Sequence, residues 1–192
     1  MTFRQCALCL LLSFASSAAF PQEPPRHFAT KGVVELGGSI AFQASRPVVN
    51  GTTGDPVFLL SAAPYAGYFV LDEFELGVNP VGVAWSKDGD NTVTDIRVFA
   101  APSYNIRTGS VVYPFVEGLA GLTVRISGTE GSSTTTSGFS WGGRGGIKIG
   151  LPGRSLVVIG AQYLVITLNP SGAANRFGTD ELSVLAGLTV WF

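Results

Sequence analysis

The chain has 192 residues, a formal net charge of −1 at pH 7, and hydrophobic and charged fractions of 46% and 13%. Soluble domains carry about 25% charged residues, so this composition predicts a chain that either hides a large apolar surface or places it in lipid. A nearly neutral chain without a basic block, or a basic face interleaved with aromatic residues, also argues against nucleic-acid binding.

The first 19 residues are organised like a secretory signal peptide. Arg4 precedes an apolar run from Cys6 to Phe14, and small residues follow up to Ala19. The run is shorter than the roughly 20 apolar residues that a membrane-spanning helix needs, and later runs are interrupted. We therefore predict cleavage after Ala19 and expect strands to cross any membrane. Because Cys6 and Cys9 precede this site, the mature chain is expected to lack disulfides and thiolate chemistry.

The next segment differs in composition from the rest of the mature chain. Residues 20–30 (FPQEPPRHFAT) are rich in proline and polar residues, which predicts a short disordered lead-in on the periplasmic side. From Lys31 onward, apolar stretches with period-two alternation predict strands. We expect eight of them, over residues 33–45, 57–70, 74–85, 92–104, 111–126, 139–149, 156–168 and 182–192.

The last predicted strand shows the alternation most clearly. One face carries Leu182, Val184, Leu188 and Phe192 and is wholly apolar, whereas the other face is mixed and includes Thr189. This difference is expected where one side of a strand meets hydrocarbon and the other side meets a packed lumen. We therefore predict that Leu188 faces lipid and that Thr189 faces the lumen.

The predicted connections alternate in length. Residues 46–56, 86–91, 127–138 and 169–181 form long polar connections, and residues 71–73, 105–110 and 150–155 form short ones. Long loops on one side and short turns on the other are typical of outer-membrane barrels. Residues 31–192 are therefore predicted to form an all-β, closed, antiparallel, eight-stranded transmembrane up-and-down β-barrel with four extracellular loops.

Aromatic residues gather near both ends of the predicted strands, as expected for rings at the two membrane interfaces. At the turn end lie Tyr68, Phe69, Phe74, Tyr104, Tyr113, Phe115, Trp191 and Phe192. At the loop end lie Phe42, Phe58, Trp85, Phe139 and Trp141.

Three stretches carry a resemblance to a known family. They are residues 58–70 (FLLSAAPYAGYFV) with the following Asp72-Glu73 and Leu76-Gly77, residues 139–149 (FSWGGRGGIKI), and the terminal residues 188–192 (LTVWF). The chain resembles the small outer-membrane β-barrel domain family, the OmpA/OmpX-like barrels, over nearly the whole mature part. The resemblance implies a location among the lipids of the cell outer membrane of a Gram-negative-type bacterium. It also implies that Phe192 belongs to the signal read by the barrel-assembly machinery.

If the face of Phe192 points to lipid, the same alternation places eight ionisable residues inside the barrel: Glu35, Glu75, Asp95, Arg97, Glu117, Arg125, Arg144 and Lys148. Buried ionisable groups are costly unless paired, so four acids and four bases predict a self-neutralised ion-pair network that closes the lumen. We expect Arg144 to be its hub, because a guanidinium can serve two carboxylates at once.

The motifs that suggest other chemistry have simpler explanations. The only histidine, His27, lies in the lead-in, so a deacylase-type site with Ser and His on the barrel wall is not expected. Glycines 142, 143, 145 and 146 precede a strand rather than the helix that a phosphate loop requires. Residues 87–91 (KDGDN) lack the later glutamate of a calcium loop. We predict no enzymatic activity, catalytic residue, metal or cofactor.

The family resemblance leaves the activity open, because its members include structural, adhesive, pore-forming and lipid-modifying proteins. Our first hypothesis is a structural or surface-interaction role, in which polar loops such as residues 132–137 meet a surface, polysaccharide or host ligand. The alternative is a narrow or gated pore for ions or small solutes. A third hypothesis is a soluble lipocalin-like carrier, which requires the apolar faces of the strands to point inward.

Overall fold

The computed structural model describes residues 27–49, 52–88, 91–129, 132–169 and 177–192. The predicted signal peptide (1–19) and the lead-in up to residue 26 lie outside the described residues. Within the described ranges, no helix is long and apolar enough to cross a membrane.

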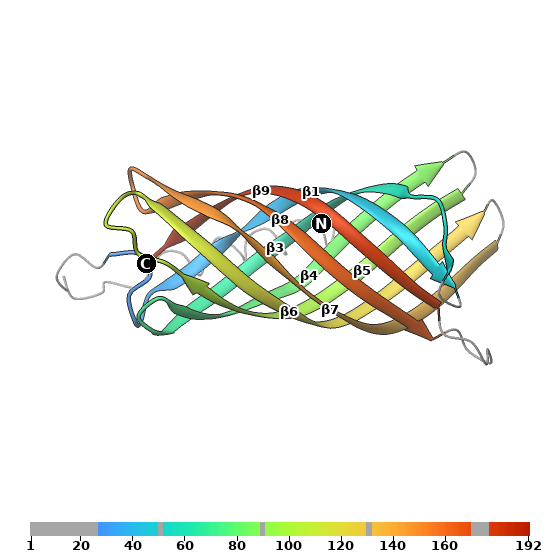
Figure 1. Cartoon of the computed structure of the whole chain (residues 1–192), viewed down its shortest axis with the longest axis horizontal. Helices are drawn as coiled ribbons and strands as arrows, with labels where there is room; N and C mark the ends of the chain where they lie inside the picture. The colour runs from blue at the N-terminus through green and yellow to red at the C-terminus, as the bar shows by residue number, and fades with distance from the viewer. Residues whose placement is uncertain (1–26, 50–51, 89–90, 130–131, 170–176) are drawn as a thin grey trace, which may run out of the picture.

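The regular elements are all strands: β1 (Val34–Val49), β2 (Thr52–Thr53), β3 (Val57–Leu71), β4 (Phe74–Asp88), β5 (Asn91–Asn105), β6 (Val112–Thr129), β7 (Ser132–Leu151), β8 (Ser155–Asn169) and β9 (Phe177–Trp191). The two-residue β2 pairs only with the end of β1. The eight long strands pair antiparallel in chain order, and β1 also pairs with β9. Together they form one long cylinder of strongly tilted strands (Figure 1). The prediction of a closed, antiparallel, eight-stranded up-and-down barrel is confirmed.

The barrel wall has an apolar outer face and a polar inner face. In β9, Leu182, Val184 and Leu188 are 61–64% exposed, whereas Ser183 and Thr189 are 2% and 5% exposed. The predicted orientations of Leu188 and Thr189 are therefore confirmed. The exposed apolar side chains of all the long strands form a belt of the kind that meets hydrocarbon. A soluble lipocalin-like carrier requires the opposite orientation, so that hypothesis is wrong.

The outer ends of the strands are longer than predicted. β6 has 18 residues and β7 has 20, whereas a strand crosses a bilayer with about 9–11 residues. The predicted loops 86–91 and 127–138 are mostly strand, and residues 132–137 form the start of β7. These residues were predicted to form loops because they are rich in serine and threonine. In the structure they pair across the β6–β7 hairpin, for example Ser127 with Thr134, and the β-branched side chain of threonine favours a strand.

An irregularity in β4 interrupts the period-two alternation that was predicted for this strand. Glu75 is fully buried and Trp85 is 50% exposed, although both have odd positions in one strand. The pairing of β4 with β5 shifts after Asn79, and the next residue, Pro80, has no N–H for the ladder. Asn79 donates from Nδ2 to the backbone carbonyl of Pro64 in the neighbouring strand β3, at 2.9 Å. This β-bulge inserts one residue and reverses the facing of the strand's outer half.

The aromatic residues form a clear ring only at the end of the barrel where the long loops were predicted, which we call the hairpin end. The five predicted there, Phe42, Phe58, Trp85, Phe139 and Trp141, are all 50–56% exposed. At the turn end, Tyr68, Tyr104 and Phe192 also face outward. Phe69 and Phe115 are 0% and 3% exposed, so their assignment to this ring is wrong. Their positions have the inward parity of their strands, and they fill the barrel instead of meeting the membrane interface.

Candidate functional site

All eight predicted lumen residues lie inside the barrel, and they separate into two layers. The lower layer, toward the turn end, contains Glu35, Glu75, Glu117, Arg144 and Lys148. The upper layer, toward the hairpin end, contains Asp95, Arg97, Arg125 and one unpredicted residue, Glu181. The side chains of all nine are at most 14% exposed.

The upper layer is a closed set of two carboxylates and two guanidinium groups. Arg97 contacts Asp95 (Nη2–Oδ2, 2.5 Å) and Glu181 (Nη1–Oε2, 2.7 Å). Arg125 donates from Nε and Nη2 to the two oxygens of Asp95, both at 2.7 Å, and from Nη1 to Thr179 at 2.9 Å. Two parallel charge-assisted hydrogen bonds are the strongest geometry for such a pair, so the layer fixes β5, β6 and β9 together.

Glu181 was missed because residues 169–181 were assigned to a loop. In the structure β9 starts at Phe177, and Glu181 is 0% exposed inside the barrel. The alternation of Thr189, Leu185 and Ser183, followed toward the start of the strand, leads directly to Glu181. The signal was therefore present in the sequence, beyond the point at which the predicted strand began.

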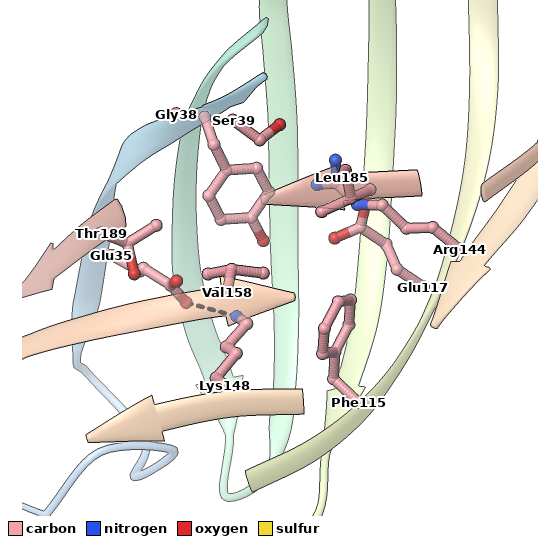
Figure 2. A pocket seen from close by; sticks show the side chains of 11 residues that line it. Glu35, Gly38, Ser39, Phe115, Glu117, Arg144, Lys148, Val158, Leu185 and Thr189 are labelled. Carbon is pink, nitrogen blue, oxygen red and sulfur yellow. Dashed lines mark hydrogen bonds and ion pairs between the residues drawn. The ribbon is translucent and has the colours of Figure 1, made fainter. Parts of the chain in front are cut away.

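In the lower layer, Lys148 contacts two carboxylates. Its Nζ lies 2.6 Å from Oε2 of Glu35 and 3.4 Å from Oε2 of Glu75. Figure 2 shows Lys148 directed toward Glu35, while Arg144 and Glu117 lie together at the other side of the cavity.

Arg144 makes one ion pair, with Glu117 (Nε–Oε1, 2.6 Å), so the prediction of an Arg144 hub is wrong. The reason is register: Arg144 lies directly opposite Glu117 in the β6–β7 ladder and pairs with it locally. Lys148 is four residues closer to the turn end of β7, at the height where Glu35 and Glu75 meet.

Neutral polar groups complete the lower layer. Ser103 and Asn105 donate to Oε2 of Glu75 at 3.0 and 3.2 Å. They continue the inward positions of Asp95 and Arg97 along β5, so the same alternation could have identified them.

The start of the described chain packs into the turn-end mouth of the barrel. Phe28 is 1% exposed, and its ring centroid lies 5.2 Å from that of Phe69 and 4.9 Å from that of Tyr113. Backbone hydrogen bonds hold this segment, from Gly32 N to Phe69 O at 2.8 Å and from Glu73 N to Ala29 O at 2.9 Å. We call residues 27–33 the stopper. The predicted disordered lead-in is thus ordered from residue 27, because one phenylalanine finds an aromatic pocket that local composition does not reveal.

Next to the stopper, the exposed Asp72 and the half-buried Glu73 of the β3–β4 turn hold the neighbouring segments through hydrogen bonds. The Lys31 backbone N–H donates to Asp72 Oδ1 at 2.8 Å, and this hydrogen bond, aided by Arg107, lowers the pKa of Asp72. The Tyr104 hydroxyl donates to Glu73 Oε2 at 2.5 Å; this bond and those from Arg107 lower the pKa of Glu73. Both carboxylates are therefore stabilised in their charged forms.

The cavities that the described residues line along the lumen are small. One of about 20 Å³ lies in the lower layer beside Glu35, Tyr65 and Lys148. A second, of about 40 Å³, lies at mid-height, and a third, of about 90 Å³, lies near the upper layer. A water needs roughly 10–15 Å³ on this scale, so these cavities have room for one to several waters. In the described part of the chain, no three His, Cys, Asp or Glu side chains are grouped to hold a metal ion.

Comparisons with known proteins place the fold. No family model and no curated protein sequence matches the chain. Among solved structures it is similar to Neisserial surface protein A, with a TM-score of 0.63 and 17% identity over 83% of this chain and 99% of that one. It is also similar to the N-terminal β-barrel domain of Pseudomonas aeruginosa OprF, with a TM-score of 0.50 and 15% identity over 84% and 98% of the two chains.

A third similar structure is Ail, the attachment invasion locus protein of Yersinia pestis, in complex with the heparin analogue sucrose octasulfate. Its TM-score is 0.50, with 18% identity over 83% of this chain and 99% of that one. At such identities the likeness concerns the fold. The resemblance to small outer-membrane barrels is confirmed at that level, and together with the exposed apolar belt this architecture is that of an integral protein of the Gram-negative cell outer membrane.

Proposed function

We propose that the protein is a non-enzymatic outer-membrane barrel with a closed lumen, which acts in a structural or surface-interaction role through the outer ends of its strands. The observation that supports the proposal is that two ion-paired layers and the stopper lie one after another inside the described barrel. Eight-stranded barrels have interiors just wide enough for side chains, and these side chains are locked to each other. Cavities of 20–90 Å³ between them leave room for water and not for a wide passage.

The outer rim supports a role in hydrogen-bonded recognition. Residues 132–135 of β7 are exposed and carry only hydroxyl side chains, and Thr52 and Thr53 of β2 are exposed as well. Arg46 and Lys87 are the exposed cations among the described residues of this rim. The similar structure of Ail holds a heparin analogue, so this fold is compatible with a carbohydrate-like ligand. The hydroxyl-rich rim of this chain favours a surface polysaccharide or host glycan that is less dependent on negative charge.

The test of recognition compares two pairs of hydroxyl groups. Folded mature protein in lipid vesicles would be applied to an array of neutral and sulfated glycans. We expect Ser133→Ala with Thr135→Ala to lower glycan binding, because both hydroxyls face outward on the rim. Thr108→Ala with Ser110→Ala is the matched control at the opposite, periplasmic end. No glycan binding by the wild type, or equal loss in both double variants, would contradict this part of the proposal.

The test of the closed lumen is conductance in planar bilayers. We expect no discrete current steps from the wild type. Reproducible steps would favour the alternative, a narrow or gated pore for ions or small solutes.

Assembly is the third element of the proposal. Phe192 is 56% exposed toward the surrounding lipid, and its backbone joins Val34 through N–O contacts of 3.0 and 3.3 Å at the closing seam. We expect Phe192→Ser to impair recognition by the barrel-assembly machinery and to accumulate in the periplasm. Normal outer-membrane levels of Phe192→Ser, compared with Phe42→Ser at the other aromatic ring, would contradict a role as assembly signal.

A further inference from the structure

The two layers differ in charge. In the upper layer, the carboxylates of Asp95 and Glu181 face two guanidinium groups. In the lower layer, three carboxylates face only two cations, Arg144 and Lys148. The lower layer therefore has one carboxylate in excess, although the side chains of Glu35, Glu75 and Glu117 are at most 1% exposed.

The excess carboxylate is one of the two that contact Lys148. Because Arg144 and Glu117 form a one-to-one pair, the single ammonium of Lys148 is left between Glu35 and Glu75. Both of these carboxylates use Oε2 toward Lys148, and the Oε1 atom of each is buried without a hydrogen-bond partner. A buried carboxylate without a cation of its own is unfavourable even where neutral donors such as Ser103 and Asn105 reach it, so this arrangement favours one more positive charge.

Other buried polar groups line the cavity beside these carboxylates. The hydroxyl of Tyr65 is buried without a hydrogen-bond partner, and it lines the same cavity as Glu35 and Thr189. The residues that face the triad of Glu35, Lys148 and Glu75 are Tyr65 from β3, Ser103 and Asn105 from β5, Glu117 from β6, Arg144 from β7 and Thr189 from β9.

The chemistry of the cavity selects a proton over a metal cation. The space is about 20 Å³, enough for one water, and a cation placed there would lie beside the ammonium of Lys148. From the periplasmic side, the ring of Phe28 lies 5.2 Å from Lys148 Nζ and covers it.

We propose that the Glu35–Lys148–Glu75 triad is a proton-binding site that holds one proton at a pH where exposed carboxylates are ionised. This inference rests on the proposed closure of the lumen. A proton on one carboxyl makes the lower layer neutral and gives an unpartnered oxygen a hydrogen to donate. Loss of the proton at high pH leaves a net negative charge under the stopper and favours entry of water. The closed state of the lower layer is therefore coupled to periplasmic pH.

The test is infrared spectroscopy of the folded protein in vesicles at neutral pH, where a protonated carboxyl has its own carbonyl band. We expect one protonated carboxyl per chain in the wild type and none in Glu75→Gln or Glu35→Gln, which remove the excess charge. Lys148→Met should raise the number to two. Glu73→Gln, a matched change on the exposed turn, should leave the band unchanged.

The proposal would be overturned if the band of the protonated carboxyl is absent in the folded wild type, or if it persists in both Glu→Gln variants. Neither result depends on whether Lys148→Met folds. A second arm replaces sodium by choline: a band that appears only in choline would assign the site to sodium and would also overturn it. Conductance steps from a wild type that retains the band would contradict the closed lumen alone, so the two proposals fail separately.

Discussion

The upper and lower layers of the lumen solve the same problem in different ways. The upper layer joins two acids and two arginines in a closed, balanced set, in which Asp95 receives hydrogen bonds from both guanidinium groups. The lower layer uses separate units, an Arg144–Glu117 pair and a Lys148 triad, and it is covered by the stopper. A balanced set depends on no external condition. A layer with an odd charge depends on a proton, and therefore on its surroundings.

The largest expected effect comes from breaking the balanced layer. Arg97 contacts both Asp95 and Glu181, so Arg97→Ala leaves Glu181 with only a 3.4 Å contact to Arg125. Removing one side of a buried pair costs about 3–5 kcal/mol, and we expect the upper part of this range. The measurement is reversible urea unfolding in lipid vesicles. Adding Glu181→Gln should recover part of the loss; a double variant no more stable than the single one would show that the layer is not one unit.

The corresponding change in the lower layer should cost less. Arg144 has one ion-pair partner, Glu117, so Arg144→Ala leaves one carboxylate without its cation, whereas Arg97→Ala removes a cation that contacts two carboxylates. We expect a loss near the lower end of about 3–5 kcal/mol, and recovery of most of it by Glu117→Gln in the same unfolding assay. If Arg144→Ala is as destabilising as Arg97→Ala, the lower layer is one connected unit like the upper layer and not a set of separate pairs.

A third pair of substitutions compares the lipid face of β9 with its lumen face at the height of the lower layer. Leu188 lies near the turn end of β9, halfway in sequence between Val184, which pairs with Phe42 of the outer aromatic ring, and the terminal Phe192. Arginine on the lipid face near the midplane costs roughly 2–4 kcal/mol. Leu188→Lys should therefore destabilise the barrel clearly, whereas Thr189→Lys adds a cation beside the excess carboxylate of Glu35. Equal unfolding free energies for these two variants would contradict the assigned excess charge.

Much of this arrangement follows from period-two alternation alone. The closed barrel, the outward face of Leu188 and the inward positions of the eight ionisable residues required no tertiary information. The alternation fails at Pro80, where a bulge reverses which face of the strand points inward. The last predicted strand also began one residue after Glu181, because the Gly, Ala and Asn content of residues 169–180 suggested a loop. The partners of Lys148 and the burial of Phe28 depend on which strand heights coincide across the barrel, and no single segment encodes that.

The smallest expected effect is at the turn that anchors the stopper, and its pH dependence is opposite in sign to that of the lower layer. The pKa values of Asp72 and Glu73 are lowered in the folded protein, chiefly by hydrogen bonds from Lys31 and Tyr104 respectively. Groups with lowered pKa values stabilise the fold above their ordinary values of about 3.9 and 4.3, and this contribution is lost as pH falls through the lowered values. Because both side chains meet solvent, the effect is small.

Acidification should therefore loosen the stopper, whereas loss of the proton from the triad loosens the lower layer at high pH. Hydrogen exchange of the Phe69 amide, which donates to the stopper residue Val33, reports the acid side. We expect slightly faster exchange in Asp72→Asn with Glu73→Gln at neutral pH, and no further acceleration on acidification. The Phe69 amide of the wild type could instead stay equally protected at pH values below the pKa of ordinary carboxyl groups. That result would show that the turn does not hold the stopper and that the aromatic pocket alone retains Phe28.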